Sequence, residues 1–328
     1  MKFILLSATL CCATPSYAGC GTTFCTVNTY WDTQGLVNKE GWRIDLRYSY
    51  AKANTPRLGS SKVSNDPTQA APGDEVENLR TVNQSLNLDL DYAINRQFGV
   101  TLGLPWVMRD HSHTLAPATV EQGKFSALGD MRVVGNYQFD SNDHHSGSGI
   151  RLGLKLPSGK TDWQFQPGIA GERSLQPGSG STDAILGAYF HQELADTPWG
   201  WFVSGQVQSA LHTKDQYRPG NDIALDVGAH YEISSALTGL LQLNTQIKQR
   251  DRYDHPDSAT HAHSGTHSGG HSLNLSPGLS FAVAPMTRLY GFVQKPLYQY
   301  ANPDPDPAVT TGQLTAPWSF AVGVSHSY

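Results

Sequence analysis

This chain lacks long apolar runs, an excess of positive charge and a rich supply of cysteine. Mean hydropathy is -0.39, and no segment after the N-terminus offers about 18 consecutive apolar residues, so we expect no transmembrane helix. The chain has 23 Lys and Arg against 28 Asp and Glu, a net charge of -5, which argues against a nucleic-acid partner. Of the 4 cysteines, Cys11 and Cys12 lie in the N-terminal apolar run.

The first residues are typical of a secretory signal peptide. Lys2 is followed by an apolar run from Phe3, and Ser16-Tyr17-Ala18 supplies the small residues of a cleavage position after residue 18. The apolar run is too short to span a bilayer. We therefore assign residues 1–18 to a signal peptide that directs the chain out of the cytoplasm.

Cys20 and Cys25 admit three interpretations. An exported protein meets an oxidising compartment, so a disulfide between them is the prediction we favour. Ala18-Gly19-Cys20 also suits a lipid anchor on Cys20, although Tyr17 stands where such signals carry an aliphatic residue. A thiolate metal or redox site is the third interpretation, with a C-x4-C spacing that differs from the usual C-x2-C pair.

From residue 42 the sequence alternates strictly between apolar and polar residues. One face of the first segment holds Trp42, Ile44, Leu46, Tyr48 and Tyr50, and the other holds Arg43, Asp45, Arg47 and Ser49. Charges facing a dry core are costly, so the polar face should meet water and the apolar face lipid. The pattern predicts about twelve strands. They lie near 42–52, 80–92, 98–108, 129–139, 149–157, 182–192, 200–210, 222–232, 237–248, 272–283, 288–296 and 317–328.

The connections between these strands alternate in length. Short links near 94–97, 140–148, 234–236 and 284–287 alternate with long loops rich in Gly, Pro, Asp and Ser. A soluble β-sandwich also alternates, but the signal peptide and the apolar last strand favour a membrane barrel. The predicted fold is all-β: a single antiparallel transmembrane β-barrel in residues 41–328, preceded by a pre-barrel or plug segment in residues 19–40.

The last segment, Trp318 to Tyr328, needs a partner. Its apolar residues alternate along one face, and such a strand would aggregate as a free edge. Pairing with residues 42–50 would close the barrel and place Tyr48 and Tyr50 beside Trp318 and Phe320. The segment resembles the C-terminal assembly signal of bacterial outer-membrane barrels, although His326 stands where an aromatic residue is usual. The resemblance implies the barrel-assembly machinery and outer-membrane lipid as partners.

The polar faces of the strands supply the candidate binding surface. Rings of opposite charge along a lumen orient polar solutes as they pass. In the alternative interpretation these groups pair with one another and fill a narrow barrel. The predicted lumen-lining residues are Arg43, Asp45, Arg47, Asn87, Asp89, Asp91, Arg132, Gln206, Gln208, Asp226, Gln242, Asn244 and Lys248.

A histidine-rich segment from Asp251 to His271 is the candidate metal site. Its imidazoles are His255, His261, His263, His267 and His271, set among Asp, Ser and Gly in an expected outer loop. Flexible imidazoles can converge on Zn, Cu or Ni, and they would also gain charge in acid. His111 and His113, in another expected outer loop, could add ligands. The alternative is a hydrophilic loop without a dedicated site.

Catalytic signals are weak. A barrel lipase needs His and Ser two residues apart on a lipid-facing strand, and the H-x-S we find, His144 with Ser146, falls in a predicted periplasmic turn. No G-x-S-x-G, C-x-x-C-H or Gly-rich phosphate loop occurs. We therefore expect no enzymatic activity.

Several segments resemble a family of outer-membrane barrels named for the meta-pathway of phenol degradation. They are C-T-V-N-T-Y-W-D-T-Q-G (25–35), G-L-P-W-V (103–107), L-G-D-M-R-V-V-G-N-Y-Q-F (128–139), G-L-K-L-P-S-G-K-T-D (153–162) and S-L-Q-P-G-S-G-S-T-D (174–183). The resemblance implies a porin-like channel for small solutes. It does not define the substrate, for which small aromatic or hydrophobic compounds are candidates. The alternative function is a metal-binding barrel that uses the His-rich segment.

Overall fold

A computed structural model describes residues 41–70, 72, 75–140, 145–166, 169–214, 216–253, 267–304 and 310–328. Within these ranges the chain is all-β apart from two short 3-10 helices, η2 (Pro67–Gln69) and η3 (Arg173–Leu175). No helix among them is long and apolar enough to cross a membrane. The predicted signal peptide, the pre-barrel segment, and Cys20 and Cys25 lie outside the described residues.

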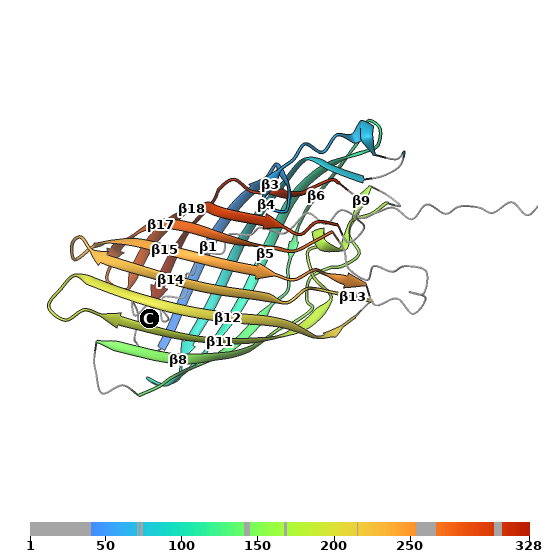
Figure 1. Cartoon of the computed structure of the whole chain (residues 1–328). Helices are drawn as coiled ribbons and strands as arrows, with labels where there is room; N and C mark the ends of the chain where they lie inside the picture. The colour runs from blue at the N-terminus through green and yellow to red at the C-terminus, as the bar shows by residue number, and fades with distance from the viewer. Residues whose placement is uncertain are drawn as a thin grey trace, which may run out of the picture.

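Twelve strand positions form a closed antiparallel barrel (Figure 1). The main sheet has 13 strands, but β6 and β7 lie end to end: β6 pairs with the outer half of β5 and β7 with its first residues. The strands are β1 (Gly41–Ala53), β4 (Glu75–Ala93), β5 (Phe98–Leu115), β6 (Thr119–Leu128), β7 (Arg132–Gln138), β8 (Ser146–Lys155), β11 (Ser181–Glu193), β12 (Trp199–Thr213), β14 (Asp222–Glu232), β15 (Leu237–Lys248), β17 (Gly270–Ala284), β18 (Thr287–Ala301) and β20 (Ser319–Ser327). The predicted fold class is confirmed.

β20 closes the barrel between β18 and β1, as the sequence predicts. Tyr50 lies opposite Phe320 and Tyr48 opposite Val322 in the β1–β20 register. The Tyr50 ring stacks on Phe320, with centroids 5.4 Å apart, and lies 5.9 Å from Trp318. β20 is therefore paired along both of its edges, and the apolar last strand presents no free edge.

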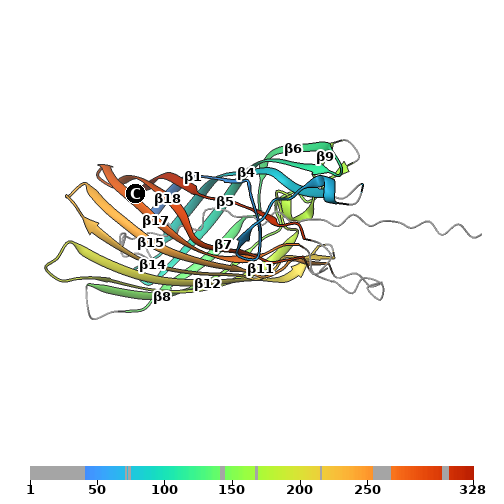
Figure 2. The same cartoon turned by 45° about the horizontal axis from the view of Figure 1, so that its top comes forward.

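The two ends of the barrel differ. Five short turns join the strands at one end, where the Tyr328 amide also donates to the Trp42 carbonyl, 2.8 Å away. Six longer connections lie at the other end and carry small strands of their own (Figure 2). These are β2 (Thr55–Leu58), β3 (Ser61–Lys62), β9 (Gln164–Gln166), β10 (Ile169–Ala170), β13 (Tyr217–Arg218), β16 (Arg252–Tyr253) and β19 (Gln313–Thr315). In outer-membrane barrels short turns face the periplasm and long loops the outside.

The outer face of the barrel is apolar. Leu152 and Leu186 are each 56% exposed, and aromatic pairs such as Trp42 with Tyr92 and Trp199 with Tyr231 surround the short-turn end. Water would make this belt unfavourable, whereas hydrocarbon solvates it, and aromatic girdles mark the two interfaces. The outer face is therefore that of an outer-membrane barrel.

One stretch of sequence is a strand where the alternation predicts a loop. β5 continues past residue 108 to Leu115 and pairs there with both β4 and β6, so the expected outer loop between 108 and 129 is mostly strand. His111 and His113 are therefore buried strand residues, and the prediction that they lie in an outer loop is wrong. The alternation of apolar and polar residues does not mark this extension, because it lies beyond the aromatic girdle near Trp106. There the outward side chains no longer face lipid and need not be apolar.

Large side chains inside the barrel lie flat on neighbouring glycines. A Cβ on Gly323 would lie 2.4 Å from the ring of Tyr290, and one on Gly228 would lie 2.5 Å from Phe202. Tyr290 in turn donates to Asp45, 2.7 Å away. These contacts explain why glycine appears in the middle of strands, where its lack of a side chain is otherwise destabilising.

Candidate functional site

A cavity of about 440 Å³ lies inside the barrel. Residues from nine strands line it, together with segments 173–179 and 217–220 from the loop end. Its basic residues are Arg47, Arg109, Arg132, Arg151, Lys155, Arg173 and Lys248, and its acidic residues are Asp89, Asp130, Asp183, Asp222 and Asp226. Seven cations against five carboxylates give the lining a positive excess, although the whole chain is acidic.

The structure brings eight of the predicted lining residues to this cavity. They are Arg47, Asn87, Asp89, Arg132, Gln206, Gln208, Asp226 and Lys248. Arg132 forms no ion pair within 4.0 Å in the described part of the chain, although it interacts electrostatically with Asp222 across the cavity lining. Arg132 is therefore a lining cation that is not held in a close ion pair.

The other five predicted residues face the barrel interior but do not line the cavity. Arg43 and Asp91 form an ion pair at 3.0 Å, and Asp45 accepts from Tyr290. Gln242 and Asn244 are fully buried, and Asn244 donates to Asp226 at 2.7 Å and accepts from Ser276 at 2.6 Å. Such satisfied buried polar groups hold neighbouring strands together rather than meet a solute.

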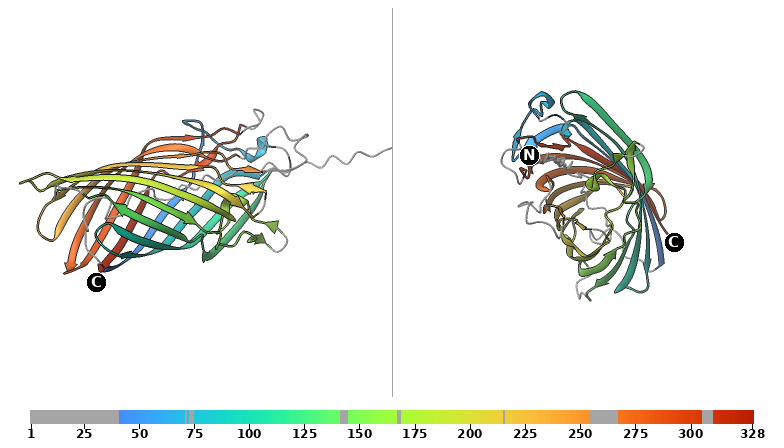
Figure 3. Two further views of the ribbon diagram at one scale, coloured as in Figure 1. Left: turned by 90° about the horizontal axis from the view of Figure 1, so that it is seen from below. Right: turned by 90° about the vertical axis from the view of Figure 1, so that its right-hand side faces the viewer.

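We call the connection between β8 and β11, residues 156–180, the inner loop, because its residues 173–179 line the cavity inside the barrel. Its η3 residue Leu175 is buried with Ala51, Ala53, Leu314 and Ala316, which gives the loop end a small apolar core. Seen from the loop end, a yellow-green segment of the inner loop lies within the ring of strands (Figure 3, right), in keeping with the place of residues 173–179 in the cavity lining. The inner loop therefore narrows the lumen from the loop side.

A buried ion-pair network fixes the inner loop to the wall. Lys155 Nζ lies 2.8 Å from Asp183 and 3.5 Å from Asp130, and it also donates to Ser179. Asp130 in turn accepts from the Ser179 amide at 2.8 Å and from the Gly159 amide at 3.0 Å. These groups are at most 9% exposed, so each charge depends on the others for its solvation.

Three of the sequence segments that carry the family resemblance meet at this network. Asp130 comes from Leu128–Phe139, Lys155 from Gly153–Asp162, and Asp183 from Ser174–Asp183. Gly159 and Gly178 come into backbone contact, since a Cβ on Gly178 would lie 2.4 Å from the Gly159 carbonyl oxygen. Strand alternation alone misses these residues, although the Pro-, Gly- and Ser-rich motifs around them could have marked them.

Arg173 of the inner loop and Arg109 of β5 line the cavity near its loop end. Arg173 stacks over Tyr217, with its guanidinium 5.1 Å from the ring centroid. Arg109 donates to Asn83 at 2.7 Å and to the Ser174 carbonyl at 3.3 Å. Burial, reinforced by nearby carboxylates, raises the pKa of Glu172 well above its usual value.

The His-rich segment is only partly described. His255, His261 and His263 lie outside the described residues. His267 is buried, with Nδ1 3.9 Å from Asp304 Oδ2. His271 is exposed and stacks on Tyr300, with ring centroids 4.7 Å apart. The two described imidazoles thus lie in different surroundings, and a shared metal site in this segment stays a prediction.

Fold and interior together define a twelve-stranded outer-membrane barrel with a charged lumen. Among solved structures, the chain is similar to the COG4313 outer membrane channel from Pseudomonas putida F1: TM-score 0.65, 12% identity, 89% of this chain and 97% of that chain covered. The NanC porin (TM-score 0.46, 11% identity) and the KdgM porin (0.44, 10%) each match 87% of this chain, covering 100% and 99% of their own. No protein-family model and no curated protein matches the sequence. At this level of identity the similarity establishes the fold.

Proposed function

We propose that the chain is an outer-membrane channel for small solutes. The observation that carries the proposal is the charged cavity enclosed by a closed barrel with an apolar outer belt. A barrel of this size leaves room for a slim passage, and the inner loop narrows it further. The passage therefore admits small molecules by diffusion and is too narrow for folded proteins.

The positive excess of the lining supports a preference for anions. Charged side chains in a confined, partly desolvated lumen interact with ions more strongly than they would in bulk water. An apolar aromatic hydrocarbon would gain little from this lining, whereas an aromatic acid could pair its carboxylate with Arg132. We therefore place small polar and anionic solutes, aromatic acids included, ahead of neutral hydrocarbons.

Planar-bilayer recordings of the refolded chain test the proposal. We expect discrete openings, and a reversal potential in a KCl gradient that indicates anion selectivity. Arg132→Ala should lower the chloride-to-potassium permeability ratio about 30-fold. A charge about 8 Å from a passing ion attracts chloride by ~1 kcal/mol and repels potassium by as much at an effective dielectric constant of about 40, so the ratio changes by ~2 kcal/mol. Lys124→Ala is the matched control, since it removes an exposed cation on the outer face. A complete absence of openings contradicts the channel; cation selectivity contradicts the role of the lining.

Two finer assignments are part of the same proposal. The motif resemblance supports membership of the barrel family named for the meta-pathway of phenol degradation. The closing strand β20, which ends beside the terminal Tyr328, supports recognition of this strand by the barrel-assembly machinery.

A further inference from the structure

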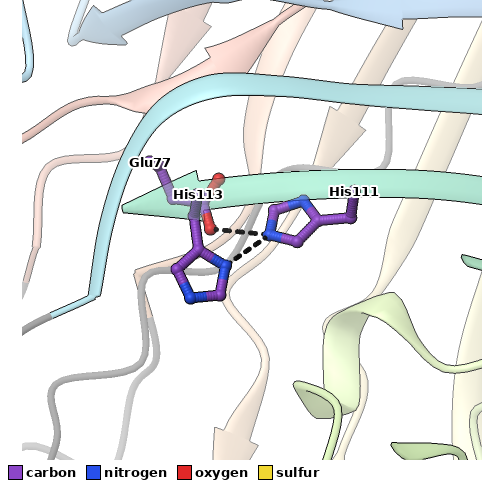
Figure 4. A group of neighbouring side chains, drawn as sticks. All are labelled: Glu77, His111 and His113. Carbon is purple, nitrogen blue, oxygen red and sulfur yellow. Dashed lines mark hydrogen bonds and ion pairs between the residues drawn. The ribbon is translucent and has the colours of Figure 1, made fainter. Parts of the chain in front are cut away.

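Glu77, His111 and His113 converge inside the barrel near its loop end (Figure 4). Each side chain offers a metal-ligand atom, and these atoms all lie within 4.8 Å of one another. His111 Nε2 is 3.0 Å from His113 Nδ1 and 3.3 Å from Glu77 Oε1. Each of the three residues is only 1% exposed. The three residues therefore form a compact, water-excluded cluster of two imidazoles and one carboxylate.

The fold brings these residues together for two reasons. Residues 111 and 113 alternate along β5, so both side chains point to the inner face. Glu77 comes from the adjacent strand β4, where the register shifts between Val76 and Arg80. Such an irregularity re-aims side chains, and here it accompanies the approach of the Glu77 carboxylate to His111.

The spacing matches what a single metal ion requires. Two ligands about 2.1 Å from a tetrahedral ion are about 3.4 Å apart. The separations of 3.0 Å and 3.3 Å from His111 Nε2 fall close to this value, and the remaining pair, Glu77 with His113, lies within 4.8 Å. The contacting atoms would need only small movements to share one ion.

Neighbouring residues orient both imidazoles. Thr81 Oγ1 lies 2.8 Å from His111 Nδ1, which leaves Nε2 directed at the cluster. Glu121 Oε2 lies 3.4 Å from His113 Nε2, which leaves Nδ1 directed at the cluster. Outer partners of this kind fix the ring orientation of metal-binding histidines, and a carboxylate makes the imidazole a stronger ligand.

The surroundings of the cluster are rich in carboxylates. Glu75 interacts electrostatically with Glu77 and Glu121, and the buried Glu172 of the inner loop interacts with Glu75 and Glu77. Carboxylates so close together in a buried region repel one another. A divalent cation would offset this repulsion.

We propose that Glu77, His111 and His113 bind a divalent transition metal of the Zn²⁺ class. Two nitrogen donors and one oxygen donor suit Zn²⁺, and three protein ligands leave a fourth position for water. None of the three residues lines the cavity, and Glu77 interacts electrostatically with His267 of the His-rich segment, whose imidazole is not one of the proposed ligands. The bound ion cross-links β4 and β5 below the long loops, so it stabilises the loop end of the barrel.

Calorimetric titration of the metal-stripped, refolded full chain with Zn²⁺ tests the proposal. We expect one tight equivalent, a Co²⁺ complex with the visible absorption of a four-coordinate site, and a higher unfolding temperature with Zn²⁺. The double variant His111→Gln and His113→Gln should weaken that equivalent by at least about 100-fold. The loop variant His255→Ser, His261→Ser and His263→Ser should retain it.

Glu77→Gln keeps the proposal testable if the double variant misfolds, because it preserves the shape of the side chain and should still weaken Zn²⁺ binding. Heat-dependent gel migration identifies which variants are folded. His191→Gln is the matched control, since it changes another buried barrel histidine remote from the cluster. The proposal is overturned if the wild type binds no Zn²⁺, or if the loop variant alone abolishes binding.

Discussion

Lys155 shows how much of the interior depends on single charges. It lies within 4.0 Å of both Asp130 and Asp183, and all three side chains are buried. Taking such charges out of water is costly, and only their mutual attraction and hydrogen bonds compensate for that cost. The position of the inner loop is therefore linked to the charge state of one lysine.

Replacing that lysine should open the channel. Lys155→Met leaves two buried carboxylates without their cation, a change that costs about 3–5 kcal/mol in comparable sites. We expect the inner loop to leave the wall and the single-channel conductance to rise. Lys124→Met is the control: its ion pair with Asp110 involves an amine whose side chain is 64% exposed, so it should change neither conductance nor stability appreciably. Unchanged conductance in Lys155→Met would show that the inner loop does not limit the current.

For individual residues, the alternation of the sequence predicts which side chains face the barrel interior, but not which of these line the cavity. It assigns Arg47 and Arg132 to the interior, where both line the cavity. It cannot separate them from Arg43, which also faces inward but pairs with Asp91. Nor does it bring Asp130 and Lys155 together, because that contact depends on a loop folding back into the barrel, and such a path has no periodic signal.

At the scale of elements, β20 is the strand whose pairing closes the barrel. It lies between β18 and β1, and the Tyr328 amide after it still bonds to the Trp42 carbonyl. The alternation of β1 and β20 made this pairing predictable. The outer half of β5 was not predictable in the same way. Where a strand extends beyond the bilayer, its outward residues need not be apolar, and the alternation is lost.

Removing the last residue should impair assembly more than any loop deletion does. Without Tyr328 the chain loses its terminal aromatic residue and the last hydrogen bond to β1. We expect lower levels of folded barrel in the membrane, measured by heat-modifiable migration and membrane fractionation. Deletion of residues 256–262 is the control and should leave these levels unchanged. Normal membrane levels of the Tyr328 truncation would contradict the role given to the closing strand.

For the whole molecule, the closed sheet predicts unusual resistance to unfolding. Apart from β6, whose ladder is with β5 alone, every barrel strand in the described part of the chain is paired on both sides, so the ring of strands offers no free edge at which separation could start. We expect the unboiled protein to migrate faster on a denaturing gel than the boiled protein, with the transition well above the melting temperatures of typical soluble domains, about 45–65 °C. Gly323→Val is expected to lower the transition, because a larger side chain would collide with Tyr290. Identical migration of boiled and unboiled wild type would contradict the barrel.

Because the inner loop is attached to the wall, the width of the opening in this barrel does not depend on the circumference alone. In a simple barrel the number of strands sets both the circumference and the width of the opening. Here the width of the opening also depends on the inner loop, which Asp130 and Lys155 hold in place, while hydrogen bonds between strands hold the wall together. Changes in the length or charge of residues 156–180 can therefore alter which solutes pass without any change in the frame that sits in the membrane.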